Sequence, residues 1–160
     1  MAMTSKSGLL SDVSGLDLTC GLGHTLCMSD FRTHARIAEA EMRTVFQATP
    51  LQLNDHLSAR YQAEIWLKRE DLSPVRSYKL RGAFNAMRKL PAQKHFVCAS
   101  AGNAAQGMAF MCAHFDVQGT IFMPVTTPQQ KIQKTQMFGG DNVTISLLGD
   151  YFDECLAAAN

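Results

Sequence analysis

The pattern of apolar and polar residues changes its period several times along this chain, and these changes predict strands that alternate with helices. Within residues 77–90 the apolar residues recur every three or four positions, as on one face of a helix: Leu80, Ala83, Phe84, Met87 and Leu90. Short apolar runs predict strands at 64–68, 95–99, 120–123 and 143–148. Patterns with the helical period predict further helices at 29–45, 54–61, 103–115, 127–139 and 152–159.

This alternation predicts the fold class. Strands that are each followed by a helix build βαβ units, whose strands are parallel and whose crossovers are right-handed. We therefore expect a three-layer α/β unit, a parallel sheet of about four strands with helices on both faces. The apolar runs at 95–99 and 120–123 should form its buried centre. The last helical pattern has no end signal before Asn160, so we expect the chain to be cut short.

Lys79 is predicted to lie in the first turn of a helix, directly after a strand and a loop. Ser77 is placed to cap this helix, because an N-cap serine accepts a hydrogen bond from the first free N–H groups. Open α/β sheets build their sites where such loops lie, at the carboxyl ends of the strands. A single lysine is more often a solvated surface residue, so Lys79 becomes a candidate only together with a second stretch.

That second stretch is Ser100–Gly107, with the sequence SAGNAAQG, which follows a predicted strand and opens the next helix. Free N–H groups gather at a helix N-terminus and suit a carboxylate or a phosphate. Gly102 permits positive φ or close backbone approach, and the Asn103 amide offers both a donor and an acceptor. On its own, a turn rich in small residues is more often plain packing.

Composition narrows the classes of function. The 160 residues are 46% hydrophobic and 18% charged, an ordinary balance for a globular chain with its own core. A net charge of +1 gives no basic field for nucleic acid, and no apolar run is long enough to span a membrane. The first residues lack the layout of a secretory signal.

The five cysteines are scattered and odd in number, which suits a reducing compartment, so we expect a cytoplasmic protein. Cys20, His24 and Cys27 lie close together in the sequence. Since no second pair stands at zinc-site spacing, we expect no metal.

Two segments carry a specific resemblance: KREDLSPVRSYKLRGAFNAM at 68–87 and CASAGNAAQG at 98–107. They resemble the hallmark segments of the threonine dehydratase (threonine ammonia-lyase) family, in the tryptophan-synthase-β-like group of pyridoxal-phosphate enzymes. Shorter matching segments are ATPL, FMP and FGG, at 48–51, 122–124 and 138–140. The likeness runs from about Ser29 to the end of the chain, and it implies the N-terminal part of that fold.

The resemblance implies a role for each matching residue. Lys79 would form the Schiff base with pyridoxal phosphate, Tyr78 would lie near the cofactor, and Asn103 would hydrogen-bond its ring 3-oxygen. The substrate carboxylate would be bound by backbone N–H groups of one loop, which comprises Ser100, Ala101, Gly102, Asn103 and Ala104.

The implied reaction is the dehydration and deamination of L-threonine, with L-serine as a second substrate, to a 2-oxo acid and ammonia. It would serve isoleucine biosynthesis or threonine catabolism, and the intact enzyme would be a homo-oligomer without a nucleic-acid or membrane partner. Ala101 favours elimination, because the racemase branch has a proton-carrying serine at this place. The alternatives are a serine dehydratase or racemase of the same family, and a non-catalytic fragment of the small domain.

Two departures from the family pattern matter. Ala104 stands where the family usually has histidine. The family's glycine-rich phosphate loop, and the residue that meets the pyridine nitrogen, do not occur in these 160 residues. Residues 1–28 carry Ser, Gly and Thr without periodicity, so we expect a flexible N-terminal arm there. The resemblance divides the rest into a segment of the large domain (29–53) and an incomplete small domain (54–160).

The missing phosphate loop generates a first prediction. Hydrogen bonds to a charged phosphate contribute on the order of 1.5–3 kcal/mol each, so losing three or four costs about 5 kcal/mol or more, at about 1.4 kcal/mol per tenfold in affinity. We expect the purified 160-residue chain to carry no stoichiometric pyridoxal phosphate and to make no 2-oxobutanoate from threonine. Absorbance and product assays check this, and a yellow chain with one cofactor at Lys79 would contradict it.

Overall fold

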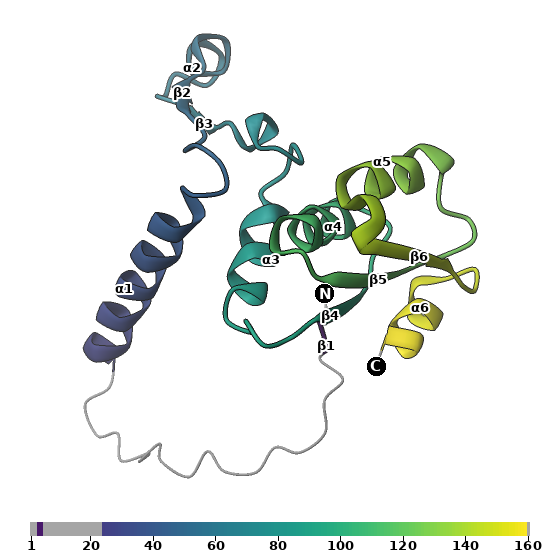
Figure 1. Ribbon diagram of the computed structural model, residues 1–160. Helices are drawn as coiled ribbons and strands as arrows, with labels where there is room; N and C mark the ends of the chain where they lie inside the picture. Colours follow the sequence, from purple (N-terminus) through teal and green to yellow (C-terminus); the bar gives the residue numbers. More distant parts are fainter. Residues whose placement is uncertain (1–2, 5–23, 160) are drawn as a thin grey trace.

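The computed structural model describes residues 3–4 and 24–159, and a four-stranded sheet lies at its centre, in the order β1-β4-β5-β6 (Figure 1). Strands β4 (His95–Ala99), β5 (Gln118–Met123) and β6 (Val143–Leu147) are parallel neighbours. In register, Cys98 lies opposite Ile121, and Ile121 opposite Ile145. The predicted parallel pairing of the two central apolar runs is thus confirmed.

Helices cover both faces of this sheet. Helices α3 (Lys79–Met87), α4 (Asn103–Phe115) and α5 (Gln129–Gly139) lie on one side, and α6 (Phe152–Ala159) lies on the other (Figure 1). Successive strand residues point to opposite faces, so Cys98 joins the large core under α3 and α4, while Ala99 joins a smaller core with Cys155 of α6. The predicted three-layer α/β class is confirmed.

The predicted strand at 64–68 does not join this sheet. Strand β3 (Trp66–Lys68) pairs antiparallel with β2 (Leu51–Leu53) in a separate two-stranded sheet. Two physical reasons explain the difference. The chain between the two strands turns back through the short helix α2 (Asp55–Tyr61), which brings β3 to its sequence neighbour, and the free edge of β4 is taken by β1 (Met3–Thr4), which pairs antiparallel with it.

Helix boundaries follow their local signals closely. Asn54 caps α2 as predicted, because its Oδ1 accepts a hydrogen bond from the Leu57 N–H at 2.8 Å. The glycine pair at 139–140 ends α5, with Gly140 at φ +53°, followed by the 3-10 turn η2 (Gly140–Asn142). Helix α1 (His24–Met42) begins before the predicted Ser29 and ends before Val45. Most of the predicted arm, residues 1–2 and 5–23, lies outside the described residues.

The β4–β5 centre generates a second prediction. Ile121 is fully buried under α4, so Ile121→Ala should lower the free energy of unfolding by about 2–5 kcal/mol. The control is Thr144→Ala on the exposed side of β6, which should change it by less than about 0.5 kcal/mol. Urea unfolding of the three chains measures both values, and equal losses in the two variants would contradict a core centred on β5.

Candidate functional site

The turn that precedes Lys79 is fixed by two nearly buried serines. After the 3-10 turn η1 (Glu70–Leu72), the Ser73 Oγ accepts a hydrogen bond from the Ser77 N–H at 2.9 Å and donates one to the Ser77 carbonyl at 3.2 Å. Arg76, between them, has φ +55°. This closed turn sets the direction in which α3 begins.

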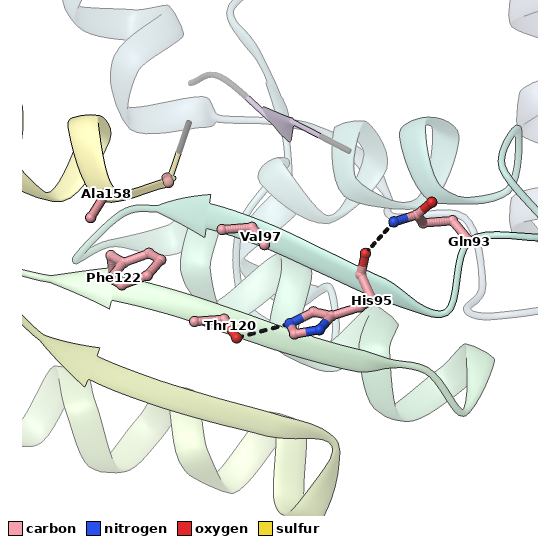
Figure 2. Close-up of a pocket in the computed structure, with 7 residues that line it drawn as sticks. Gln93, His95, Val97, Thr120, Phe122 and Ala158 are labelled. Atoms are coloured by element: carbon pink, nitrogen blue, oxygen red, sulfur yellow. Dashed lines mark hydrogen bonds between the residues drawn. The ribbon is translucent and has the colours of Figure 1, made fainter. Parts of the chain in front are cut away.

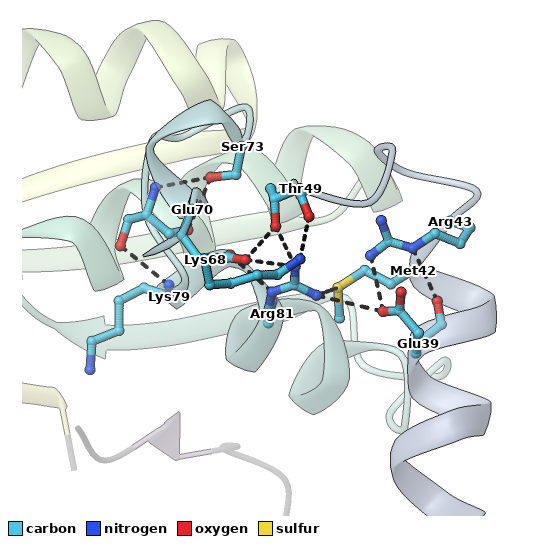
Figure 3. Close-up of polar contacts among 10 residues, drawn as sticks. Glu39, Met42, Arg43, Thr49, Lys68, Glu70, Ser73, Lys79 and Arg81 are labelled. Carbon is cyan, nitrogen blue, oxygen red and sulfur yellow. Dashed lines mark hydrogen bonds and ion pairs between the residues drawn. The ribbon is translucent and has the colours of Figure 1, made fainter. Parts of the chain in front are cut away.

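Helix α3 begins at Lys79, and Tyr78, not the predicted Ser77, takes its N-cap position. Ser77 still serves the helix start, because its Oγ accepts the Lys79 N–H at 3.3 Å. The Lys79 side chain is half-buried, and its Nζ lies 5.2 Å from the centre of the exposed Tyr78 ring. Figure 3 shows this amine extending away from the neighbouring polar cluster.

The structure brings the Lys79 backbone directly against the second predicted stretch. A Cβ placed on Gly107 would lie 3.3 Å from the carbonyl carbon and oxygen of Lys79. Gly107 lies in the second turn of α4, so this turn is the neighbour of the first turn of α3. The two stretches that the sequence singled out therefore meet.

The loop before α4 extends the hydrogen bonding between β4 and β5 by one residue and then forms a local turn. The Ser100 N–H donates to the Phe122 carbonyl at 3.0 Å, and the Ser100 Oγ accepts the Gly102 N–H at 3.3 Å. Asn103 is exposed at the start of α4, whereas Ala104 is buried and Ala101 is half-buried. These predicted residues therefore lie together at the carboxyl end of β4.

Gly102 was expected to have a positive φ or a close backbone neighbour, and the structure shows neither. Its φ of −132° is extended backbone that any residue adopts, and among the described residues nothing lies within 4 Å of a Cβ built there. Close approach and positive φ therefore do not explain this glycine in the structure. The close approach occurs at Gly107 instead.

A polar cluster beside α3 was not found from the sequence (Figure 3). The Arg81 guanidinium donates two hydrogen bonds to the Glu70 carboxylate, from Nε at 2.9 Å and from Nη2 at 2.8 Å. The buried Thr49 hydroxyl donates to the same carboxylate at 2.6 Å and accepts from Arg81 Nη2 at 3.2 Å. The Lys68 amine donates to the Thr49 carbonyl. Thr49 stands 19, 21 and 32 residues from Lys68, Glu70 and Arg81, so no local spacing in the sequence could have indicated the cluster.

Both charges of the cluster are stabilised by their partner. The hydrogen bonds from Arg81 lower the pKa of Glu70, against the opposing effect of burial, and Thr49 and the nearby Lys68 charge lower it further. Glu70 in turn raises the pKa of Arg81. On its other side Arg81 lies 3.6 Å from Glu39 of α1. The cluster therefore ties α1, the hairpin segment and the first turn of α3 together.

One buried polar atom in α4 stays without a partner. Gln106 is 4% exposed, and its Oε1 has no hydrogen-bond partner among the described residues. It is the direct neighbour of Gly107, in the stretch that meets Lys79. An orphaned acceptor at this place fits a site that receives a polar molecule.

A separate hollow of about 260 Å³ lies on the α6 side of the sheet (Figure 2). Its lining includes His95, whose Nε2 lies 2.8 Å from the Thr120 hydroxyl, and otherwise mainly apolar side chains such as Val97 and Phe122. No predicted site residue lines it, so it is not part of the candidate site.

Other chemistries find no support in the part of the chain that the structure describes. Burial raises the pKa of both Cys98 and Cys112 to about 12, so neither thiol is a ready nucleophile. Within these residues no group of three His, Cys, Asp or Glu side chains is arranged to hold a metal ion. The helices of the same residues include none that is both long and apolar enough to cross a membrane.

These features define a class of protein first. In this α/β unit one helix begins at a lysine and the next begins at an exposed asparagine after a sheet strand, and open α/β sheets build their ligand sites at this edge. Comparison then gives the family. The sequence profile of the pyridoxal-phosphate dependent enzymes matches residues 42–160, and the chain belongs to that family.

Known relatives agree with this assignment. The chain is 49% identical over 129 residues to the biosynthetic L-threonine dehydratase of Bacillus subtilis, covering 79% of this chain and 31% of the relative. It is 53% identical over 121 residues to that of Lactococcus lactis, covering 74% of this chain and 29% of the relative. The chain thus spans about a third of the length of these relatives.

Solved structures show the same fold. Threonine deaminase isoform 2 of Solanum lycopersicum has a TM-score of 0.64 at 41% identity, over 71% of this chain and 31% of the other. Maize serine racemase has a TM-score of 0.70 at 21% identity, over 79% of this chain and 39% of the other, and so shows the fold alone.

The Arg81 cluster generates a third prediction. The folded pKa of Glu70 lies below its ordinary 4.5, so the pair stabilises fully above about pH 4.5 and loses this contribution as the pH falls through the lowered pKa. Glu70→Gln should lower the free energy of unfolding at neutral pH by about 1.5–3 kcal/mol and flatten its decline in acid.

Urea unfolding at several pH values measures this, with Glu64→Gln, an exposed carboxylate of the same segment, as the control. If both variants lose stability equally, or if Glu70→Gln keeps the acid sensitivity of the parent, the cluster does not have this role.

Proposed function

We propose that this chain supplies the lysine-bearing part of a pyridoxal-phosphate enzyme that dehydrates and deaminates L-threonine to 2-oxobutanoate and ammonia. L-serine is the second substrate, and isoleucine biosynthesis the route that the names of the relatives favour. The observation that carries the proposal is the close approach of Gly107 to the Lys79 backbone, because it brings the candidate lysine beside the helix that the candidate substrate loop opens.

The residues present fit the cofactor. Lys79 offers a half-buried side chain at the start of α3 whose amine extends away from the Arg81 cluster, and Asn103 offers an exposed amide at the start of α4. The orphaned Gln106 Oε1 lies in the same turn of α4 as a further acceptor. When bound, pyridoxal phosphate supplies an electron sink for the carbanion at Cα. Lys79 would attach it covalently and Asn103 would hydrogen-bond its ring oxygen.

The loop at 100–104 would bind the substrate carboxylate. Free backbone N–H groups at a helix N-terminus favour an anion, and α4 begins at Asn103. The Ala101 side chain has no acidic group that could deliver a proton to the substrate, which favours elimination over racemisation. Ala104, where the family usually has histidine, is buried and leaves the loop without an imidazole.

The division at residues 28 and 53, a cytoplasmic location and homo-oligomeric assembly belong to the same proposal. Three cysteines, Cys98, Cys112 and Cys155, are buried free thiols, which suits a reducing compartment.

Leu51, Leu53 and Trp66 expose apolar side chains on the β2–β3 hairpin. A two-stranded sheet is marginally stable alone, so this surface supports a further protein layer over the hairpin in the working enzyme.

A chimera tests the proposal and gives the fourth prediction. Residues 42–160 of this chain would replace the matching part of the Bacillus subtilis relative. We expect the chimera to form 2-oxobutanoate from threonine and Lys79→Ala to abolish this activity, because the attachment point is lost.

Lys89→Ala, in the exposed turn just after α3, is the matched control and should keep the activity. A folded chimera that is inactive beside an active parent relative, or an active Lys79→Ala variant, would refute the proposal. Assays with serine and with the D-amino acids identify the alternative serine dehydratase and racemase activities.

A further inference from the structure

We infer that Gly107 is the positioning residue for Lys79, because its missing side chain lets α4 lie directly on the backbone with which α3 begins. The inference rests on the proposed function, in which Lys79 attaches the cofactor. It assigns to Gly107 no contact with substrate or cofactor.

The atoms that a side chain at Gly107 would meet are all backbone atoms. A Cβ there would lie 3.3 Å from the carbonyl carbon of Lys79, from its oxygen, and from the Leu80 nitrogen. A crowded side chain can rotate away, but a helix backbone moves only as a unit. Gly107 has no positive φ in α4, so space and not conformation requires glycine here.

The two hydrogen bonds that tie Lys79 and Leu80 back to Ser77 are long, whereas the next one, from the Arg81 N–H to the Tyr78 carbonyl, has an ordinary length of 3.0 Å. The Lys79 N–H reaches the Ser77 Oγ at 3.3 Å, and the Leu80 N–H reaches the Ser77 carbonyl at 3.5 Å, both long for N–H···O bonds. Leu80 is fully buried between α3 and α4. The approach of α4 at Gly107 therefore sets where the Lys79 backbone lies, and hence where its amine starts.

Two other glycines provide matched controls. Gly82 lies in the middle of α3, and among the described residues nothing comes within 4 Å of a Cβ built on it. Gly139, at the end of α5, would place a Cβ 3.0 Å from Val143 Cβ, with the γ-carbons nearer still. Gly82→Ala therefore adds a methyl group to α3 without a steric clash. Gly139→Ala creates a steric clash with Val143, in a part of the core that does not contact Lys79.

The first measurement uses the 160-residue chain and records backbone and lysine side-chain NMR shifts of the native state. Gly107→Ala should move the signals of Lys79, Leu80 and Arg81, including the Lys79 side chain, because α3 must yield by a few tenths of an ångström. Gly139→Ala should lower stability but leave these signals in place. If Gly107→Ala unfolds the chain, the double variant with Gly82→Ala restores helix stability without restoring the space.

The second measurement titrates pyridoxal phosphate into the chimera and follows visible absorbance. Gly107→Ala should weaken covalent attachment on the order of tenfold, because a shifted Lys79 amine loses part of the favourable orientation toward the cofactor, while Gly82→Ala and Gly139→Ala should bind as the parent does. If Gly107→Ala binds like Gly139→Ala, or leaves the Lys79 signals unmoved, the inference is overturned although the proposed function stands. A parent chimera that attaches no cofactor contradicts the proposed function itself, and the inference with it.

Discussion

The pairing of Arg81 with Glu70 and Thr49 is the constraint on which the arrangement of this chain depends. The β2–β3 hairpin is exposed on both sides, and neither strand buries a side chain in the core. The hairpin segment is joined to the α/β unit by the partly buried Arg81 guanidinium, which binds Glu70 through two hydrogen bonds and Thr49 through a third, and by Val75, which is buried in the core. Removing one partner of such a pair leaves the other charge uncompensated, which is why the pair determines the geometry around it.

Lys79 lies between this cluster and α4. Arg81 holds the first turn of α3 from one side, two residues after the lysine, while Gly107 admits the α4 backbone on the other. The Ser73–Ser77 turn fixes the chain just before it. The backbone of Lys79 is thus held on three sides, while its amine extends away from the Arg81 cluster (Figure 3). A fixed backbone with an extended, accessible amine is what covalent attachment of a cofactor requires.

The sequence predicted elements well where a local signal decides them. Strand β4 and helix α4 begin and end at the predicted residues, because apolar runs and turn residues mark both. Prediction from the sequence failed where a contact between residues far apart in the chain determines the structure. The place of β3 depends on pairing with β2, and the Thr49–Glu70–Arg81 cluster joins residues far apart in the chain. The candidate residues were found by their pattern, but the importance of Gly107 over Gly102 depends on helix packing. The roles assigned to Lys79, Tyr78, Asn103 and the loop stay predictions.

The central claim is that Lys79 is the attachment point for pyridoxal phosphate, and reductive trapping tests it most directly. The chimera would be loaded with the cofactor, reduced with borohydride, digested and mapped by mass spectrometry. The account predicts a single pyridoxyl group on the peptide that contains Lys79. A pyridoxyl group on another lysine, or unmodified Lys79 in a chimera that forms 2-oxobutanoate, would contradict it.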